Sequence, residues 1–450
     1  MSKRIVLLEL NEVPLIVFQR YADKSRSFRK LLNLFTVYHT RSHDNTHLSP
    51  WVTWPTVHRG VTHEKHHIDN LGQDLAVQNK EYPPIWQHLK ARGLSVGVYG
   101  SLHSSQIPED FNDYKFYVPD PFSPHSICNP QSLSSFQDFQ LRLSRKSARN
   151  VSSSIASTQP ITLLFTLLQK GLTIRSLVLL VLQLIHERID KARLARRRIL
   201  QVYLNFDVFK RLLYTKKPSF STFFTNHVAS SLHRYWEASY PSDYVCATQS
   251  LSWKRVYRNE ISFAMKATSY IVGELVRYID RTPESELWIC TSMGQEPIQG
   301  YEAIHTQLLL TKPLILLDFL GLDRHLYQLA PAMAPRVTFS STNRSNIDLL
   351  IQRLRGFTIH GEPLEVFSQE LTTSLRVMHW NIEPDLRYYG SPVDLSDCGF
   401  EMVSIADSTG TSAYHTPNGV LMIYGPNSDR FNPSEELPTH NIFSLIDSTL

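Results

Sequence analysis

Residues 84–100 read PIWQHLKARGLSVGVYG, and they are the clearest indication of the fold class. Its first part, residues 84–93, reads as a helix that ends at Gly93, and residues 94–100 read as a strand. Another apolar strand covers residues 3–10, and strand and helix patterns alternate again at 220–226, 260–280 and 287–291. We therefore expect an α/β protein with a doubly wound, mostly parallel sheet.

The length of 450 residues allows a full α/β domain and an inserted segment. We predict an N-terminal part of the α/β core at 1–128, a linker plus a basic helical insertion at 129–217, and a C-terminal part of the core at 218–450. Within these parts, residues 23–34 are expected to be helical and 129–160 an irregular, Ser-rich linker. We expect a strand–turn–strand at 399–425 and a loosely organised end over the last 25 residues.

The helical segment 161–217 is apolar at first and basic afterwards. Between His186 and Pro218 it carries ten Lys or Arg residues and three acids. Such a segment can make a peripheral contact with an anionic membrane surface, or it can pack its apolar face on the main domain and leave its cations in solvent. No nucleic-acid partner is expected, because the basic helix lacks interleaved stacking aromatics.

Cysteine usage and the chain's apolar runs bear on its compartment. The four cysteines lie far apart and form no CxxC pair, which argues against a zinc knuckle and a disulfide framework. The N-terminus shows no signal-peptide pattern, and the longest uncharged apolar runs are about half of the ~20 residues that a spanning helix needs. A cytoplasmic location is the default expectation, with a peripheral membrane contact as a variant of it.

Five segments, in order along the chain, hold the polar residues of a candidate site. They are residues 5–12, 53–61, 224–236, 288–297 and 415–426. Together they resemble the alkaline phosphatase superfamily, in particular its type I phosphodiesterase/nucleotide pyrophosphatase and sulfatase-like branches. The resemblance implies that each segment sits at the carboxyl end of a sheet strand and supplies part of a two-metal site. It covers most of the chain outside 129–217 and implies an alkaline-phosphatase type of sheet.

The first and third segments correspond to metal-binding positions of that family. Asn11 stands where the family has a ligating Asp, and an amide brings no negative charge, so affinity for a transition metal should drop. Glu12 can substitute, while Asn-Glu after a strand is also an ordinary helix cap. Asn226 takes a second Asp position. His233 follows seven residues later, further than the family spacing, and His227 is the alternative ligand.

The second segment resembles the family's nucleophile turn, Thr-Phe-Pro leading into a helix. Thr53 is our candidate nucleophile, because a metal and a helix N-terminus both favour the alkoxide. The helix up to Gly60 is shorter than the family pattern, so Ser49 and Thr56 are rivals; all three hydroxyls can also simply cap and pack a turn. Arg59 is a candidate anion-binding catalytic residue.

The fourth segment departs from the family pattern, and the fifth agrees with it. Ser292 and Met293 occupy the places of a ligating Asp and His, and neither suits a hard-metal or zinc phosphoesterase site. His415, followed by a Gly-containing turn and a strand that ends in Gly-Pro, matches the family's last metal-ligating His. It is the residue that we most expect to be functional, although a His in a turn can also be a hydrogen-bonded packing residue.

These residues predict a phosphodiesterase or phosphotransferase-like hydrolase with a reduced metal site, which acts on an anionic phosphate or sulfate ester. One divalent ion, zinc or manganese, would be held by at least two imidazoles. The alternative is a non-catalytic pseudoenzyme of the same fold that binds no ion and serves in binding or assembly. A third interpretation is a metal-free enzyme that clamps its anionic substrate with Arg59, Arg234 and the basic insertion.

Overall fold

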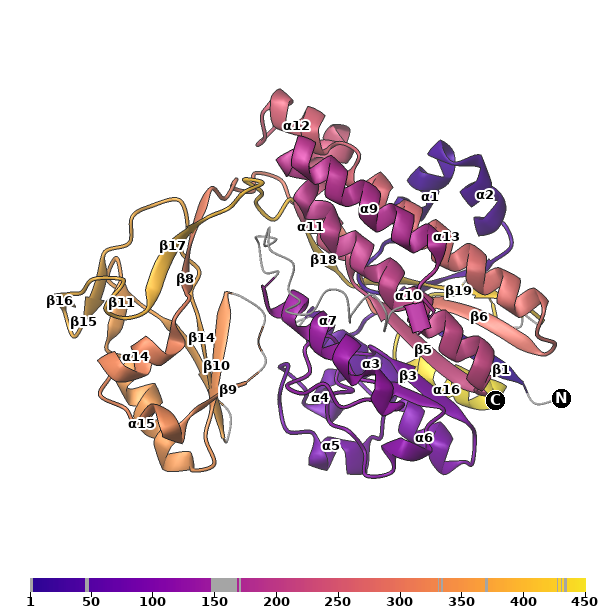
Figure 1. The fold of residues 1–450 in the computed structure, drawn as a ribbon, viewed down its shortest axis with the longest axis horizontal. Coiled ribbons are helices and arrows are strands. Elements are labelled where there is room, and N and C mark those ends of the chain that lie inside the picture. The colour runs from indigo at the N-terminus through magenta and orange to yellow at the C-terminus, as the bar shows by residue number, and fades with distance from the viewer. Residues whose placement is uncertain are drawn as a thin grey trace.

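The protein is described by a computed structural model, which covers residues 3–44, 48–146, 168–169, 171–330, 332, 335–368, 371–426, 428–429, 431–432 and 435–450. At its centre lies an eight-stranded sheet (Figure 1). The strands in spatial order are β20 (Leu437–Pro438), β2 (Thr36–Arg41), β19 (Asn418–Tyr424), β6 (Ser285–Cys290), β1 (Arg4–Leu10), β5 (Phe220–Thr225), β3 (Val96–Tyr99) and β4 (Phe116–Val118). The predicted strands at 3–10, 94–100, 220–226 and 287–291 are all present.

The sheet is mostly parallel, as predicted. β1 pairs in parallel with β5 on one side and with β6 on the other. β19 is the exception, since it runs antiparallel to both β6 and β2. β1 reads RIVLLEL and is buried on both faces, which is typical of a central parallel strand. The carboxyl ends of β1, β5 and β6 therefore meet at one edge, together with the amino end of β19.

Helices cover both faces of the sheet, so the fold is doubly wound. Val6, Leu8 and Leu10 of β1 point into the larger core, which is built with helices of one layer. These are α1 (Leu15–Lys24), α2 (Arg26–Leu32), α10 (Arg197–Lys216), α11 (His227–Ser239) and α13 (Glu260–Asp280). Ile5 and Leu7 point to the opposite face, where α3 (Pro50–Arg59), α6 (Ile85–Ala91) and α16 (Asn441–Thr449) pack. The predicted α/β class is confirmed.

Three local predictions need correction. The helix expected at 23–34 is two helices, because Ser25 leaves the helical conformation and caps α2 by accepting a hydrogen bond from the Phe28 amide. The expected linker 129–160 contains the helix α7 (Ser134–Lys146), whose Phe136 side chain is buried, while residues 147–160 lie outside the described residues. The last residues are not loose, since α16 packs Ile442 and Ile446 into the core.

The helical segment predicted at 161–217 is helical where it is described. It forms α9 (Ile174–Ile189), the 3₁₀ helix η3 (Lys191–Arg196) and α10, while residues 161–167 and 170 lie outside the described residues. α10 is part of the layer that covers the sheet, and α9 lies outside it (Figure 1). Among the helices that the structure describes, none has the length and apolar character needed to cross a membrane.

A second unit with its own apolar core occupies residues 306–404, to the left in Figure 1. Two antiparallel strands, β8 (Thr306–Leu310) and β17 (Phe400–Ser404), connect it to the rest. It contains α14 (Pro313–Phe319), α15 (Arg344–Leu354) and two four-stranded sheets. One sheet consists of β13 (Glu365–Ser368), β14 (Thr372–Arg376), β10 (Arg336–Ser340) and β9 (Gln328–Ala330); the other of β12 (Glu362–Pro363), β11 (Phe357–Ile359), β15 (Leu386–Tyr388) and β16 (Ser391–Pro392). The sequence analysis did not distinguish this unit from the core.

Candidate metal centre

A cluster of one carboxylate and two imidazoles lies at the carboxyl edge of the central sheet. Glu12 follows β1, His233 lies on α11, and His415 lies on β18 (Ala413–Thr416). Their nearest ligand atoms all lie within 4.8 Å of one another. Glu12 Oε2 is 2.8 Å from His233 Nε2 and 3.3 Å from His415 Nε2. Three segments far apart in the sequence thus converge on one carboxylate oxygen.

Both imidazoles are oriented by backbone carbonyls. The Nδ1 atom of His233 donates to the Ala413 oxygen at 2.7 Å, and Nδ1 of His415 donates to the Leu48 oxygen at 2.7 Å. A carbonyl oxygen only accepts, so Nδ1 carries the hydrogen in both rings. Nε2 then bonds the Glu12 carboxylate only while it too carries a hydrogen, and loss of that hydrogen leaves an Nε2 lone pair that faces Glu12. Second-layer hydrogen bonds of this kind orient metal-ligating histidines in proteins.

The electrostatics of the cluster favour an ionised Glu12. Burial by itself would raise the pKa of this carboxyl, but the imidazoles of His415 and His233 outweigh burial and hold the pKa well below its ordinary value. Burial lowers the pKa of His415, and the adjacent Glu12 carboxylate overcomes this and raises the pKa. A metal ion would compete for the Nε2 lone pair with the proton that Nε2 shares with Glu12. Metal binding should therefore release protons.

Asn11 lies beside the cluster and positions Glu12. Trp54 Nε1 can only donate, and it lies 2.8 Å from Asn11 Oδ1, which fixes the orientation of the amide. Asn11 Nδ2 then donates to Glu12 Oε1 at 2.7 Å and to Asn226 Oδ1 at 2.9 Å. The predicted ligands Asn11 and Asn226 thus have their carbonyl oxygens engaged with protein donors. The amide supports the neighbouring carboxylate, which an aspartate at this position could not do.

The backbone turns Glu12 toward the histidines. Glu12 has a φ of 55°, a left-handed conformation that is uncommon for a residue with a side chain. Such conformations cost of order 1–3 kcal/mol and persist where the surrounding structure determines them. Here the hydrogen bonds to Glu12 from Asn11, His233 and Gln295 supply that constraint. The acid of this site therefore stands one position after the expected one.

Gln295 is a member of the site that the sequence analysis did not select. It lies on β7 (Gly294–Pro297), directly opposite His415 in the antiparallel ladder with β18. Its Nε2 donates to Glu12 Oε2 at 2.5 Å and to the Ala229 oxygen at 3.3 Å. Its Oε1 is buried and has no hydrogen-bond partner. The only sequence signal for it was its position in the Ser-Met-Gly-Gln segment after β6.

The spacing of His233 follows from the geometry of α11. Seven residues are close to two helical turns, so His233 lies on the same face as Asn226 but roughly 10 Å further along. Beyond it, Tyr235 has non-helical dihedrals (φ −122°), and the chain before β18 docks there. The Ser412 amide donates to the His233 oxygen at 2.7 Å. This contact holds α11 and β18 together and places His233 next to His415. The ring centroids of the two histidines are 5.3 Å apart.

His227, the alternative ligand, lies outside the cluster. Both of its ring nitrogens bond hydroxyls: Nδ1 is 2.8 Å from Thr225 Oγ1, and Nε2 is 3.0 Å from Thr268 Oγ1. Burial lowers the pKa of His227 to about 4, so the ring is neutral at physiological pH. The structure places it as a packing residue of α11, because the first helical turn points its side chain at α13.

The three candidate nucleophiles differ in access. Ser49 caps the N-terminus of α3 and is half-buried, and it follows Leu48, whose carbonyl accepts from His415. Thr53 is fully buried one turn into α3, where its hydroxyl bonds the Ser49 carbonyl at 3.1 Å and Ser292 Oγ at 2.9 Å. Thr56 is also buried and donates to Asp44 Oδ2 at 2.6 Å. Of the three, Ser49 meets the N-terminal position that an activated hydroxyl needs.

Arg59 lies at the far end of α3 and faces away from the cluster. Its guanidinium donates to the carbonyl oxygens of Gln78 and Tyr82 at 3.1 and 2.5 Å and to Asn79 Oδ1 at 2.8 Å. Burial lowers the pKa of Arg59 to about 10. These contacts anchor the segment around α5 (Ala76–Glu81) instead of a substrate. Arg234, part of the third interpretation, donates to Ser230 Oγ on its own helix.

The variant positions after β6 are interior residues. Ser292 and Met293 are both fully buried, and Ser292 bonds Thr53. The second metal position implied by the resemblance therefore carries two buried neutral side chains, of which Ser292 bonds α3 through Thr53.

The donor set at Glu12 fits a divalent metal ion. One carboxylate oxygen and two imidazole nitrogens are ligands of catalytic zinc sites, which keep a further position for water or substrate. The unpartnered Oε1 of Gln295, next to this set, is a neutral oxygen that a bound water or ion can satisfy. Manganese accepts the same nitrogen and oxygen ligands. The described residues thus include three ligand atoms that could hold one ion.

No family model and no curated protein sequence matches the chain. Solved structures similar along the whole chain include murine ectonucleotide pyrophosphatase/phosphodiesterase 5, with 11% identity, a TM-score of 0.39 and coverage of 99% of this chain and 94% of that one. Phosphonoacetate hydrolase from Sinorhizobium meliloti 1021, in complex with phosphonoacetate, shows 12% identity, a TM-score of 0.44 and coverage of 100% and 96%. Both belong to the alkaline phosphatase superfamily, the family that the five segments resemble. Similarity at this level concerns the path of the chain and says nothing about activity.

Proposed function

We propose that this protein is a phosphate-ester hydrolase or phosphotransferase that works with a single divalent ion, zinc or manganese, held by Glu12, His233 and His415. The observation that carries the proposal is the convergence of three ligand atoms within 4.8 Å, with both histidines presenting Nε2. The substrate class is an anionic phosphate or sulfate ester. A divalent ion in this position would stabilise negative charge on an ester oxygen.

The chain's own groups have separate roles in this proposal. Asn11 and Gln295 hold Glu12 in place through hydrogen bonds to its two oxygens. Ser49, at the N-terminus of α3, is the hydroxyl best placed for nucleophilic attack, because the helix dipole favours its alkoxide. Thr53, our choice from the sequence, is a positioning residue here, since its hydroxyl bonds the Ser49 carbonyl.

The pseudoenzyme alternative also has an observation in its favour. Glu12 already forms ion pairs with both histidines and accepts from Asn11 and Gln295, so the cluster is largely satisfied by protein groups. Buried networks of this kind can serve structure alone. The two functions differ in a measurable property: the hydrolase binds one ion per chain, and the pseudoenzyme binds none.

The test is metal binding and hydrolysis on the same preparations. We would equilibrate wild type, Glu12→Gln and His415→Ala with zinc or manganese, measure bound ion by elemental analysis, and assay aryl phosphodiester hydrolysis. Wild type should hold one ion per chain, and each variant should lose it together with activity. Asn11→Ala removes only a supporting hydrogen bond, so its affinity should fall about 10–100-fold.

His227→Gln and the exposed His305→Ala serve as controls, because both histidines lie outside the cluster. Both should retain the ion. Ser49→Ala and Thr53→Ala distinguish the nucleophiles: Ser49→Ala should abolish hydrolysis and retain the ion. An absence of bound ion, together with equal trace rates in wild type and His415→Ala, would sink the enzyme proposal. The cytoplasmic location stays a prediction.

A further inference from the structure

The helix α9 has its polarity reversed relative to an ordinary surface helix. Its buried side chains are polar: Ser176, Gln183 and Glu187. Its exposed face is apolar, with side chains between 44% and 83% exposed; they are Ile174, Val178, Val181, Leu182, Ile185 and Ile189. The spacing of four, three, one, three and four residues puts all six on one stripe. We call these six residues the α9 stripe.

The charges around the α9 stripe are mostly positive, and the one partly exposed acid, Asp190 at the end of α9, is paired with Arg193. Glu187 is the single acid of α9, and it is buried and paired with Arg197 at 2.5 Å. Arg175 and Arg188 are exposed on the same helix, and the exposed Lys191 follows it. An apolar stripe whose flanking cations outnumber its acids complements an anionic surface with an apolar layer beneath it.

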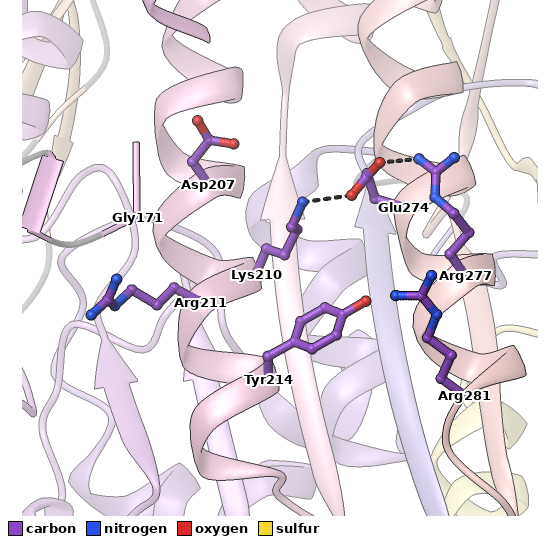
Figure 2. Close-up of a pocket in the computed structure, with 8 residues that line it drawn as sticks. All are labelled: Gly171, Asp207, Lys210, Arg211, Tyr214, Glu274, Arg277 and Arg281. Carbon is purple, nitrogen blue, oxygen red and sulfur yellow. Dashed lines mark hydrogen bonds and ion pairs between the residues drawn. The ribbon is translucent and has the colours of Figure 1, made fainter. Parts of the chain in front are cut away.

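A basic groove opens at the beginning of α9 (Figure 2). It has a volume of about 450 Å³ and lies between α10 and α13, with Gly171 at its rim, three residues before the α9 stripe begins. The first turn of α9 rests on the same two helices, since the Thr173 amide donates to Asp207 Oδ2 of α10 and Arg175 stacks on Tyr270 of α13. The groove and the α9 stripe are therefore neighbours.

The groove carries an excess of cations. Its charged lining residues are Lys210, Arg211, Arg277 and Arg281 against Asp207 and Glu274. Glu274 is already paired with Lys210 and Arg277, as the dashed lines in Figure 2 show. Within the described part of the chain, the guanidinium groups of Arg211 and Arg281 have no hydrogen-bond or ion-pair partner. Arginine guanidinium groups bind phosphate oxygens in a bidentate manner.

We propose that α9 docks this protein on the surface of an anionic phospholipid bilayer. The α9 stripe enters the interfacial layer, and Arg211 and Arg281 face lipid phosphate groups. α9 is 16 residues long, about 24 Å, and lies along the surface because the ~30 Å hydrocarbon core exceeds its length. This inference does not depend on the proposed hydrolase activity.

A second copy of the chain is the main rival occupant. The six exposed aliphatic side chains of the α9 stripe offer an apolar area on the order of 300 Å², whereas a stable interface buries about 800 Å² per partner. Two copies would also bring the cations of both α9 helices together. The area and the charge both favour a lipid surface over self-association.

The test is flotation of the full chain with vesicles of phosphatidylcholine alone and of phosphatidylcholine mixed with phosphatidylglycerol. Wild type should float with the anionic vesicles, and high salt should weaken the binding. The double variant Val181→Asn/Ile185→Asn should bind about tenfold more weakly or worse. Arg211→Glu/Arg281→Glu should lose the preference for anionic vesicles.

The matched control is Val77→Asn/Leu349→Asn, which changes two exposed aliphatic residues on α5 and α15 and should bind like wild type. Equal binding by wild type and the α9 double variant would overturn the proposal. A wild type that floats with neither kind of vesicle would also overturn it. If that wild type is a dimer and the α9 double variant is a monomer, a second copy of the chain covers the stripe. If the wild type is a monomer, the chain itself covers the stripe or leaves it bare. All readouts are of binding, so they stand apart from the hydrolysis assay.

Discussion

Replacing Asn11 with aspartate is expected to destabilise the protein at neutral pH, and the loss should shrink as the pH falls. In the wild type, Asn11 Nδ2 donates to Glu12 Oε1 at 2.7 Å and to Asn226 Oδ1 at 2.9 Å, while Trp54 fixes the orientation of the amide. An aspartate has the same shape but only accepts. It would place a second carboxylate oxygen against Glu12 inside the protein, where like charges disfavour double ionisation.

The magnitude follows from the separation of the two groups. Two unit charges 2.7 Å apart repel by about 6 kcal/mol at an effective dielectric constant of 20. Keeping one proton on the pair is cheaper, since it costs about 4 kcal/mol at pH 7 for a carboxyl with an ordinary pKa near 4. A hydrogen bond through that proton recovers about 1 kcal/mol. We therefore expect a net loss of about 3 kcal/mol in the free energy of unfolding at pH 7.

The sign of the pH dependence distinguishes this mechanism from a general loss of packing. The pair would hold a proton in the folded state that the unfolded chain releases, so its folded pKa lies above the unfolded one. Its penalty is then absent near pH 4 and grows by about 1.4 kcal/mol per pH unit above that value, until the folded pKa is reached. A packing defect would cost the same at every pH.

The assay is urea unfolding of metal-free wild type and Asn11→Asp between pH 5 and pH 8. Asn33→Asp is the matched control, because Asn33 is exposed and the substitution is chemically the same. Equal stabilities of wild type and Asn11→Asp at pH 7, or a loss that does not vary with pH, would refute the idea that the Asn11 amide supports an ionised Glu12.

Three further outcomes follow from buried polar groups. Arg59→Met leaves three oxygens around α5 without their donor, so the free energy of unfolding should fall by about 3 kcal/mol while the amount of bound ion is unchanged. Loss of the ion at unchanged stability would contradict the anchoring role of Arg59. His227 has a pKa of about 4 in the folded protein, below the ordinary 6.5, so the unfolded state takes up the proton first. About 3 kcal/mol of stability should be lost as the pH falls from 6.5 to 4. Acid titrations of His227→Gln should lack this loss. Glu260→Gln breaks the ion pairs of a buried carboxylate with Arg193 and Arg196 and should lower the free energy of unfolding in urea by about 2–3 kcal/mol. Asp348→Asn, in the exposed pair with Arg344, should lower it by about 0.5 kcal/mol or less. Similar losses in both variants would show that burial does not determine the cost.

Much of the fold could be predicted from the sequence, because its helices and strands have local sequence patterns. The helix expected at 260–280 is α13 with the same limits, and its buried residues follow the helical period. The strands β1 and β5 are runs of apolar residues that are buried on both faces. The unit at 306–404 escaped prediction because its strands are mostly two to five residues long, too short to show a period.

The candidate site was readable only in part. His233 and His415 were selected from the resemblance, and the structure brings them together. Thr53 was chosen over Ser49 as the candidate nucleophile, although a hydroxyl at a helix start and one a turn later look alike in the sequence. Gln295 had no signal beyond its position, since its role depends on a β ladder with His415 that no local pattern encodes.

The strand ends that carry polar side chains could be located from the amino-acid sequence alone, because a buried parallel strand is an apolar run and its end is marked by the first polar residues. Which of these side chains face one another depends on how the folded chain brings distant segments together. Asn11 continues the alternation of β1 and meets Trp54 on one side, whereas Glu12, in a left-handed conformation, turns to His233 and His415. A shift of one residue changes the direction of a side chain, and the contacts that select the direction come from chain segments more than 200 residues away.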